Sequence, residues 1–479
     1  MKLANVVGSG PNGLSAAIAL ARQGVRVRVF EGHTVAGGSL RTEAATLPGF
    51  RHDIGAAVFP MAVASPFLRS LPLARHGLDW IEPEIPLAHP LPNGDAVALF
   101  HSLEETANHL REDGEAYRDL MQNIVRAWHD LIYEVLGPIF HLPRHPFALA
   151  GFGLKAFQPA TTLARSHFRT DRARTLFAGL AAHAVVPLDS LATSAVALVL
   201  GATAHTGGWP IARGGSQAVA DALVGVLGSF RGTVETNHWV SSVDDLPPAD
   251  CTLLDVTPQQ FLQLAGESLP LDRRRPYVKF RRGPGICKID WALSSPIPWQ
   301  NDLCRRAGTI HLGGSEQEIV ASEVDAFEGR DNDRPFVLLS QPSLFDPSRA
   351  PAGKHTAWAY CHVPNGSTRD MTPAIEAQVE RFAPGFRDVI LARNTRTAPQ
   401  MEAWNPNLLG GDVSGGAMEL SQLLRRPKLP PYSTPVPGVF LCSSSTPPAG
   451  GVHGMCGALA AEAAALHLGI PLPPLRPQR

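Results

Sequence analysis

Short apolar runs and glycine turns at the start of the chain predict a strand, a helix and a second strand. Residues 3–7 are mostly apolar, as a strand buried on both faces requires. A helical pattern with an alanine-rich stripe follows from about residue 14 to 22 and stops at Gly24. Residues 26–30 then alternate polar and apolar side chains, which is typical of a strand.

The middle of the chain changes its periodicity twice. Residues 102–204 carry apolar positions at helical spacing, cut into pieces by prolines. The stretch 191–204 is the most apolar, but it is too short to span a bilayer, so we expect a buried helix, with a membrane-dipping surface as the alternative. Further elements are predicted as a helix at 217–227, strands within 232–243, 251–256, 286–293, 336–341, 356–363 and 439–442, and an alanine-rich helix at 455–468. The proline-rich tail after Gly469 is predicted to be loose.

The turn between the first strand and the first helix carries the chemistry. Gly8 lets the chain leave the strand sharply, Gly10 leaves room for a pyrophosphate, and Gly13 lets the helix approach the sheet. Pro11 falls in the first helical turn, where a missing N–H does no harm. The free N–H groups of this helix would point at phosphates. The alternative is a glycine-rich turn that binds nothing.

Glu31 follows directly after the second strand, where a carboxylate can accept both hydroxyls of a ribose. A free 2′-hydroxyl is implied, so FAD or NAD fits better than NADP. A pyridine-nucleotide disulfide reductase would need a second glycine fingerprint and a redox cysteine pair, and the sequence has neither. This combination favours one tightly held FAD.

Composition narrows the class of protein. The chain has 479 residues, enough for two to three domains, with 44% hydrophobic residues and a net charge of −1. Such a charge gives no field that would attract nucleic acid. The six cysteines form no C-x-x-C pair, so we expect free thiols in a reducing compartment. The sequence carries no secretory signal, and we expect a cytoplasmic protein, with membrane association left open.

Two blocks of the sequence resemble the flavin-dependent amine oxidase and phytoene desaturase superfamily, and in particular the bacterial phytoene-dehydrogenase-related oxidoreductases. The first block, residues 8–55, includes the glycine pair at 37–38. The second block runs from Asn405-Pro406-Asn407 through Gly410-Gly411-Asp412 to the closing motif Gly450-Gly451-Val452-His453-Gly454. The resemblance spans most of the chain, and its two ends are the specific parts.

The resemblance implies a set of cofactor-binding residues. The ADP part would be held by Gly8, Gly10, Pro11, Asn12, Gly13 and Glu31. The pyrophosphate would lie along Gly37, Gly38 and Ser39, the adenine would meet the backbone of Val240, and the isoalloxazine would lie beside Gly451, Val452 and His453. Many members carry Arg where this chain has Ser39, and whether Arg41 compensates is open.

The predicted fold class is α/β, with a Rossmann-type FAD-binding domain interleaved with a mixed-sheet and helical substrate domain. We expect residues 1–75, 205–275 and 410–479 to form the FAD-binding domain. Residues 76–204 and 276–409 would form the substrate-binding domain, which includes the helical insert.

The resemblance implies a FAD-dependent oxidoreductase acting on a lipophilic substrate, by C–C desaturation with electrons passed to oxygen or a quinone. A redox-neutral double-bond isomerase or a saturase would have the same sequence features. A flavin amine oxidase is a further alternative; its lysine would be Lys279, Lys288 or Lys354, and no paired aromatics are evident near the final motif. A flavin-binding scaffold is a third hypothesis, from a different class.

Few side chains are candidates for catalysis. His453 is the proposed base if one exists, because imidazole titrates near neutral pH; otherwise it packs or caps at a helix start. Asp53 is interpreted as a structural acceptor, and the pair His141 and His145 is not predicted to bind metal, because Pro143 lies between them. The run 273–275 is interpreted as a solvated loop, with a phosphate or acidic partner as the alternative. The expected partner is a lipophilic small molecule rather than nucleic acid, and peripheral membrane contact and a homodimer are left open.

Overall fold

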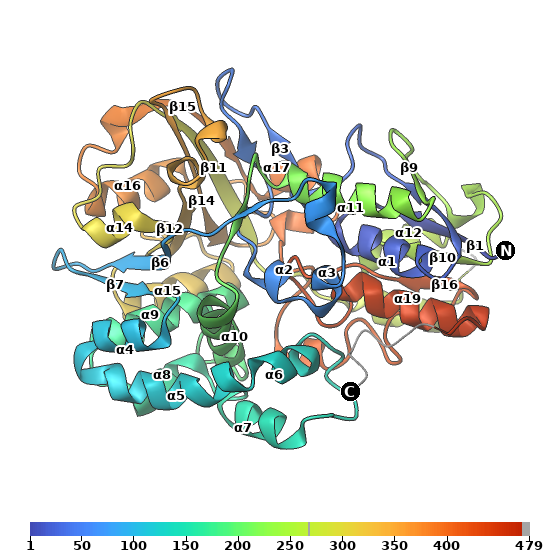
Figure 1. Ribbon diagram of the computed structural model, residues 1–479, viewed down its shortest axis with the longest axis horizontal. Coiled ribbons are helices and arrows are strands. Elements are labelled where there is room, and N and C mark those ends of the chain that lie inside the picture. Colours follow the sequence, from blue (N-terminus) through green and yellow to red (C-terminus); the bar gives the residue numbers. More distant parts are fainter. Residues whose placement is uncertain (267–268, 472–479) are drawn as a thin grey trace.

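The computed structural model describes residues 1–266 and 269–471, which are built around two sheets (Figure 1). The smaller sheet is parallel, and its strands follow the order β16-β10-β1-β2-β9. They come from distant parts of the chain: β1 (Leu3–Val7), β2 (Arg26–Phe30), β9 (Thr233–Glu235), β10 (Cys251–Leu254) and β16 (Val439–Leu441). The predicted loose tail falls outside the described residues from position 472 onward.

Three helices cover the parallel sheet: α1 (Pro11–Ala21), α11 (Gln217–Ser229) and α19 (Met455–Leu468). Helices α1 and α19, from opposite ends of the chain, lie side by side (Figure 1). A Cβ at Gly457 would lie only 1.8 Å from the carbonyl oxygen of Asn12, so a glycine is required at this crossing. The close packing brings the start of α19 next to the start of α1.

The larger sheet is mixed, and its strands follow the order β15-β11-β14-β13-β12-β6-β7. Neighbouring strands are antiparallel except for the parallel pair β12 and β6. The strands are β6 (Ile85–Pro90), β7 (Ala96–Leu99), β11 (Gly285–Leu293), β12 (Ala307–Leu312), β13 (Val337–Ser340), β14 (His355–Val363) and β15 (Ile390–Arg396). Helices α15 (Glu316–Phe327) and α16 (Thr372–Phe382) both pack against β14.

A helical insert follows β7 and lies below the larger sheet in Figure 1. Its helices are α4 (Leu103–His109), α5 (Gly114–Arg126), α6 (Trp128–Val135), α7 (Pro146–Ala156), α8 (Ala160–His167), α9 (Asp171–Ala181) and α10 (Thr193–Thr206). Helix α10 is the predicted apolar helix, and it contacts α5, α7 and α9. Among the described residues, no helix has both the length and the apolar character needed to cross a bilayer.

The structure confirms the predicted α/β class and the Rossmann-type unit, and it corrects two local predictions. The strand expected within 232–243 ends at Glu235, because Asn237 takes a positive φ of 56° and its N–H donates to His33 O. The predicted loop at 273–275 is instead part of helix α13 (Leu271–Val278), which is anchored by buried Tyr277 against Phe261.

Candidate functional site

One cavity of about 1000 Å³ joins the parallel sheet to the mixed sheet. At one end it is lined by the turn after β1, by Glu31 and by Val240. Its walls continue past residues 450–453 of the closing motif and reach the helical insert and one face of β14. The carboxyl ends of parallel strands are the usual place for a ligand in such a sheet.

Two glycine loops form the floor of the first part of this cavity. A Cβ at Gly38 would lie 2.9 Å from the Cα of Gly10, so the two loops touch through their backbones. A Cβ at Gly13 would lie 2.1 Å from the carbonyl oxygen of Gly8. These approaches leave bare backbone facing the cavity, which is the surface that a pyrophosphate needs. The residues present therefore fit a dinucleotide.

Glu31 stands at the end of β2 and is held by neighbouring backbone. Its Oε2 accepts hydrogen bonds from the Ser9 N–H at 3.0 Å and from the Ser9 hydroxyl, and its Oε1 accepts from the His33 N–H at 2.8 Å. The carboxylate is thus fixed at the position where a ribose would lie. Val240, predicted to meet the adenine, lines the same end of the cavity.

Asp255 is a residue of this site that sequence reasoning missed. It follows β10 directly, and its Oδ2 accepts the Gly13 N–H at 2.9 Å from beneath the glycine turn. Burial is the main cause that raises its pKa to about 7, and the nearby Glu31 charge adds to the effect. Its position at the carboxyl end of a parallel strand is the signal that could have identified it.

The motif Asn405-Pro406-Asn407 connects the second glycine loop to the end of β10. The Asn405 side-chain amide donates to Ser39 Oγ at 2.9 Å, and that of Asn407 donates to the Asp255 carbonyl at 2.8 Å. Arg41 does not line the cavity; its guanidinium lies 4.1 Å from the centre of the Trp404 ring and donates to the Trp404 carbonyl. Arg41 therefore supports the loop from behind rather than facing the pyrophosphate position.

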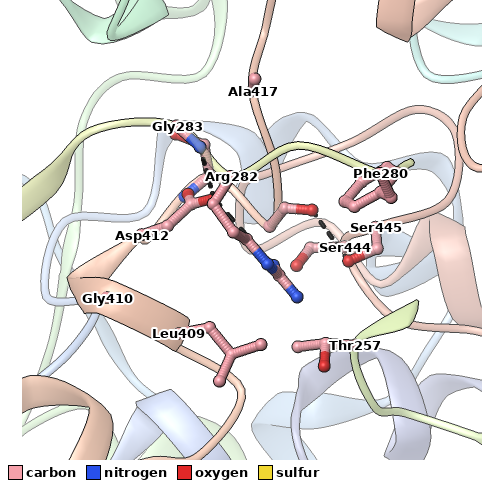
Figure 2. Close-up of polar contacts among 12 residues, drawn as sticks. Thr257, Phe280, Arg282, Gly283, Leu409, Gly410, Asp412, Ala417, Ser444 and Ser445 are labelled. Carbon is pink, nitrogen blue, oxygen red and sulfur yellow. Dashed lines mark hydrogen bonds and ion pairs between the residues drawn. The ribbon is translucent and has the colours of Figure 1, made fainter. Parts of the chain in front are cut away.

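The Gly410-Gly411-Asp412 motif has a structural role, which Figure 2 shows. Asp412 is fully buried and accepts the backbone N–H of Gly283 at 3.0 Å and that of Ser414 at 2.8 Å. Arg282 Nη1 lies 4.0 Å from Oδ2 of the same carboxylate, and the two side chains lie next to each other in Figure 2. The guanidinium balances the buried carboxylate, and the pair holds the 412–415 segment against the cavity wall.

His453 lines the cavity within the closing motif, as do Gly451 and Val452. The ring is buried, and both of its nitrogens contact backbone: Met455 N–H donates to Nδ1 at 3.0 Å, and Nε2 lies 3.1 Å from the Ala449 carbonyl. Burial lowers the pKa of His453 to about 4. This is the capping arrangement that the sequence left open, and a catalytic role for His453 stays a prediction.

The far part of the cavity is an apolar chamber with one polar wall. Its apolar lining comes from α7 and α10: Leu149, Phe152, Ala156, Val196, Val199 and Leu200. The opposite wall is β14, where Trp358, Tyr360 and His362 face the chamber. The rings of Trp358 and Tyr360 are stacked, with centroids 6.1 Å apart. The sequence prediction looked for paired aromatics near the final motif, and the pair lies on this strand instead.

Of the three candidate lysines, Lys288 lines the cavity, whereas Lys279 and Lys354 are exposed outside it. Lys288 is the register partner of Tyr360 across β11 and β14, and its ammonium is paired with the buried Asp290 carboxylate. Burial lowers the pKa of Lys288. Its Nζ lies 5.5 Å from the centre of the Trp358 ring.

The remaining candidate residues, Asp53 and His141, make structural contacts. Asp53 is buried and accepts from Arg349 at 2.6 Å and from the Ser216 N–H at 2.8 Å, which is the structural role predicted for it. His141 contacts Glu134 and the Pro138 carbonyl. Within the described ranges, no cluster of three or more His, Cys, Asp or Glu side chains could hold a metal ion.

The sequence is similar to several known oxidoreductases. A family model for an NAD(P)-binding Rossmann-like domain matches residues 6–71. The mouse pyridine nucleotide-disulfide oxidoreductase domain-containing protein 2 is 26% identical, with 95% of this chain and 92% of that protein covered. A phytoene dehydrogenase from Streptomyces griseus is also 26% identical, with 82% of this chain and 78% of that protein covered.

Solved structures show the same fold. An oxidoreductase from Methanosarcina mazei has a TM-score of 0.67 at 16% identity, with 97% of this chain and 100% of that one covered. Putrescine oxidase bound to putrescine has a TM-score of 0.61 at 18% identity, with 98% of each chain covered. The protein is an oxidoreductase, and its sequence is similar to members of the superfamily that includes the phytoene dehydrogenases; the solved structures show that it shares the fold of the flavin amine oxidases. Its phytoene dehydrogenase and carotenoid desaturase relatives confirm the resemblance drawn from the terminal motifs.

The name of the mouse relative mentions disulfide chemistry, for which this chain lacks the necessary centre. All of its cysteines are buried and free: Cys251, Cys287, Cys304, Cys361, Cys442 and Cys456. Burial raises the pKa of the Cys442 and Cys456 thiols next to the parallel sheet, so these thiols stay protonated and unreactive. The described residues therefore offer a dinucleotide-binding cradle and no cysteine pair for disulfide exchange.

Asp255 should make stability depend on pH. Its folded pKa of about 7 lies above the unfolded value of about 3.9, so its contribution is fully present below pH 4 and is lost as the pH rises through 7. Urea unfolding without added dinucleotide should show wild type losing stability relative to Asp255→Asn, by up to about 1.4 kcal/mol per pH unit within that window. If the unfolding free energies of the two proteins changed equally with pH, the raised pKa of Asp255 would be contradicted.

Proposed function

We propose that the protein is a FAD-dependent oxidoreductase that acts on a lipophilic substrate by desaturating a C–C bond, with electrons passed to oxygen or a quinone. The observation that carries the proposal is the continuity of one cavity from the dinucleotide cradle to an apolar chamber. A lipophilic molecule in that chamber would reach the redox centre without crossing water, and apolar walls bind it by the hydrophobic effect.

The choice of FAD follows from the cradle. Glu31 stands where a ribose with a free 2′-hydroxyl would lie, and a 2′-phosphate there would meet a carboxylate. Bound FAD would supply the hydride acceptor. The glycine loops would hold its phosphates, while Gly451 and Val452 would place one edge of the ring beside the chamber. Double-bond isomerisation and saturation would use the same arrangement.

An amine oxidase is the second candidate, and the wall formed by β14 favours it. The stacked pair Trp358 and Tyr360 and the buried Lys288 all line the cavity. Amine oxidases bring aromatic rings and a lysine toward the substrate amine, and putrescine oxidase shares this fold. The ion pair between Lys288 and Asp290 weakens the case, because it commits the ammonium to a carboxylate.

We also propose that the chamber opens toward a membrane surface. Three residues that line the cavity are also exposed at its rim: Ile139 by 45%, Phe157 by 53% and Leu191 by 60%. Two further apolar side chains of this segment are exposed: Leu142, which precedes α7, by 91%, and Phe147, in the first turn of α7, by 92%. An exposed apolar rim around a cavity mouth suits uptake of a lipophilic substrate from a bilayer.

Anaerobic mixing of the FAD-loaded protein with substrates of each class separates the two catalytic candidates. We expect lipophilic polyenes or acyl compounds to bleach the yellow flavin absorbance, and primary amines to leave it unchanged, because the chamber is apolar. The measurement is stopped-flow absorbance, with Lys288→Met as a comparison. Bleaching by amines that is lost in Lys288→Met would establish the amine oxidase instead.

Flotation with phosphatidylcholine vesicles tests the proposed membrane contact. Phe147→Glu should lower the membrane-bound fraction by about tenfold, because it removes one large exposed apolar side chain. The matched control is Leu466→Glu, which changes an 83% exposed leucine on α19 and should bind as wild type does. Equal losses in the two variants, or no binding by wild type, would contradict a contact at this rim.

A further inference from the structure

Strand β14 presents a row of polar and aromatic side chains to a chamber that α7 and α10 line with apolar side chains. Trp358, Tyr360 and His362 alternate along one face of the strand and line the cavity, while Ala359 and Cys361 are fully buried behind them. The strand period of two residues places the row on one wall. This wall faces the helical insert across the chamber and is separate from the cradle where the dinucleotide would bind.

His362 is the member of this row whose ring a carboxylate orients. Its Nδ1 lies 2.9 and 2.8 Å from the two carboxylate oxygens of Glu323, on α15, and both residues are buried. A carboxylate accepts hydrogen bonds, so the proton is on Nδ1 and the lone pair is on Nε2. None of the described residues hydrogen-bonds to Nε2. A base held by a second group, with its other nitrogen available, is the arrangement used in acid–base catalysis.

Among the described residues, the other histidines that line the cavity are His141, His183, His238 and His453. His238 lies at the cradle end, where its ring packs on Phe30 with centroids 4.8 Å apart and its Nδ1 is 3.8 Å from a Glu235 carboxylate oxygen. Both ring nitrogens of His453 contact backbone, and those of His141 contact Glu134 and a carbonyl. His183 faces the chamber near His362, but its Nε2 is 3.1 Å from Nε2 of buried His311, and burial lowers the pKa of His183 to about 3. His362 is therefore the best-placed base among the described cavity histidines.

Tyr360 supplies a neighbouring donor. Its hydroxyl forms no hydrogen bond with another described residue, and its ring centre is 5.8 Å from that of His362. Burial and the Glu323 charge raise the pKa of Tyr360, so the hydroxyl stays protonated. A pure hydrocarbon would leave both Tyr360 and His362 without partners in a dry chamber, and burying a polar group without a hydrogen-bond partner is unfavourable. An oxygen atom on the substrate would remove that cost.

We propose that the lipophilic substrate carries a carbonyl oxygen, which the Tyr360 hydroxyl binds, and that His362 is the residue that exchanges the adjacent proton. His362 Nε2 removes a proton from the α-carbon, and bound FAD would supply the acceptor for the hydride that leaves the β-carbon, so that a C=C bond forms between the two carbons. Glu323 stabilises the resulting imidazolium, which releases the proton to water. This inference rests on the proposed function, since the flavin is the oxidant and oxygen or a quinone reoxidises it.

The test separates proton exchange from redox turnover. FAD-loaded protein is incubated anaerobically in D₂O with 2-tetradecanone, and deuterium at the α-carbons is followed by mass spectrometry. We expect wild type to catalyse exchange, His362→Gln to slow it by about 100-fold, and Glu323→Gln to slow it less. His129→Gln, which alters an exposed histidine on α6, is the matched control and should exchange as wild type does.

A second readout concerns binding alone. The shift in flavin absorbance should give 2-tetradecanone a Kd at least about tenfold lower than tetradecane, and Tyr360→Phe should remove most of that difference without changing alkane binding. The Tyr360 and Glu323 variants keep the test valid if His362→Gln does not fold. Exchange without flavin reduction would contradict the proposed desaturation but support His362, oriented by Glu323, as the base. Absence of exchange by wild type, or equal exchange in His362→Gln, would overturn this role of His362.

Discussion

The cofactor cradle depends on backbone segments that approach one another more closely than side chains allow. Gly13 packs over the carbonyl of Gly8, Gly38 packs on Gly10, and Gly457 packs on the carbonyl of Asn12. A Cβ at any of these glycines would lie within 3 Å of another backbone atom. These contacts bring the turn after β1, the second glycine loop and the start of α19 to one place. The position of the cavity follows from them.

The two sheets supply different parts of the site. The parallel sheet supplies backbone N–H groups and the carboxylates of Glu31 and Asp255 at the cradle. The mixed sheet supplies one wall of the chamber, and the helical insert supplies the apolar side chains opposite that wall. The segment 405–407 connects the parts, because it hydrogen-bonds to Ser39 and Asp255 while lining the cavity itself. The same packing thus shapes both the cradle and the chamber.

Local patterns in the sequence predicted the elements that depend on neighbouring residues. The strands β1 and β2, the helix α19 and the glycine turn all depend on short-range spacing, and they lie where they were expected. The strand β14 was also predicted, but its pattern does not tell which face meets a cavity. That is why Tyr360 and His362 were missed as site residues.

Long-range partnerships could not be predicted from one sequence. Glu323 meets His362 across 39 residues, and Asp255 meets Gly13 across 242. His453 was chosen because its motif lies beside the predicted flavin, yet the hydrogen bonds that occupy its nitrogens depend on the backbone path of the closing loop. Motifs therefore identified the glycine turns of the cradle, whereas the surroundings of His453 depend on contacts that no motif specifies.

Titration of FAD into the apoprotein shows whether one FAD binds in the cradle with its ribose at Glu31. We expect one FAD per chain and a Kd that rises by about 10–100-fold in Glu31→Gln, since a charge-assisted hydrogen bond is lost. Glu235→Gln, at the exposed end of the neighbouring strand β9, should bind FAD as wild type does. Failure to bind FAD, or equal binding by Glu31→Gln and wild type, would contradict the account.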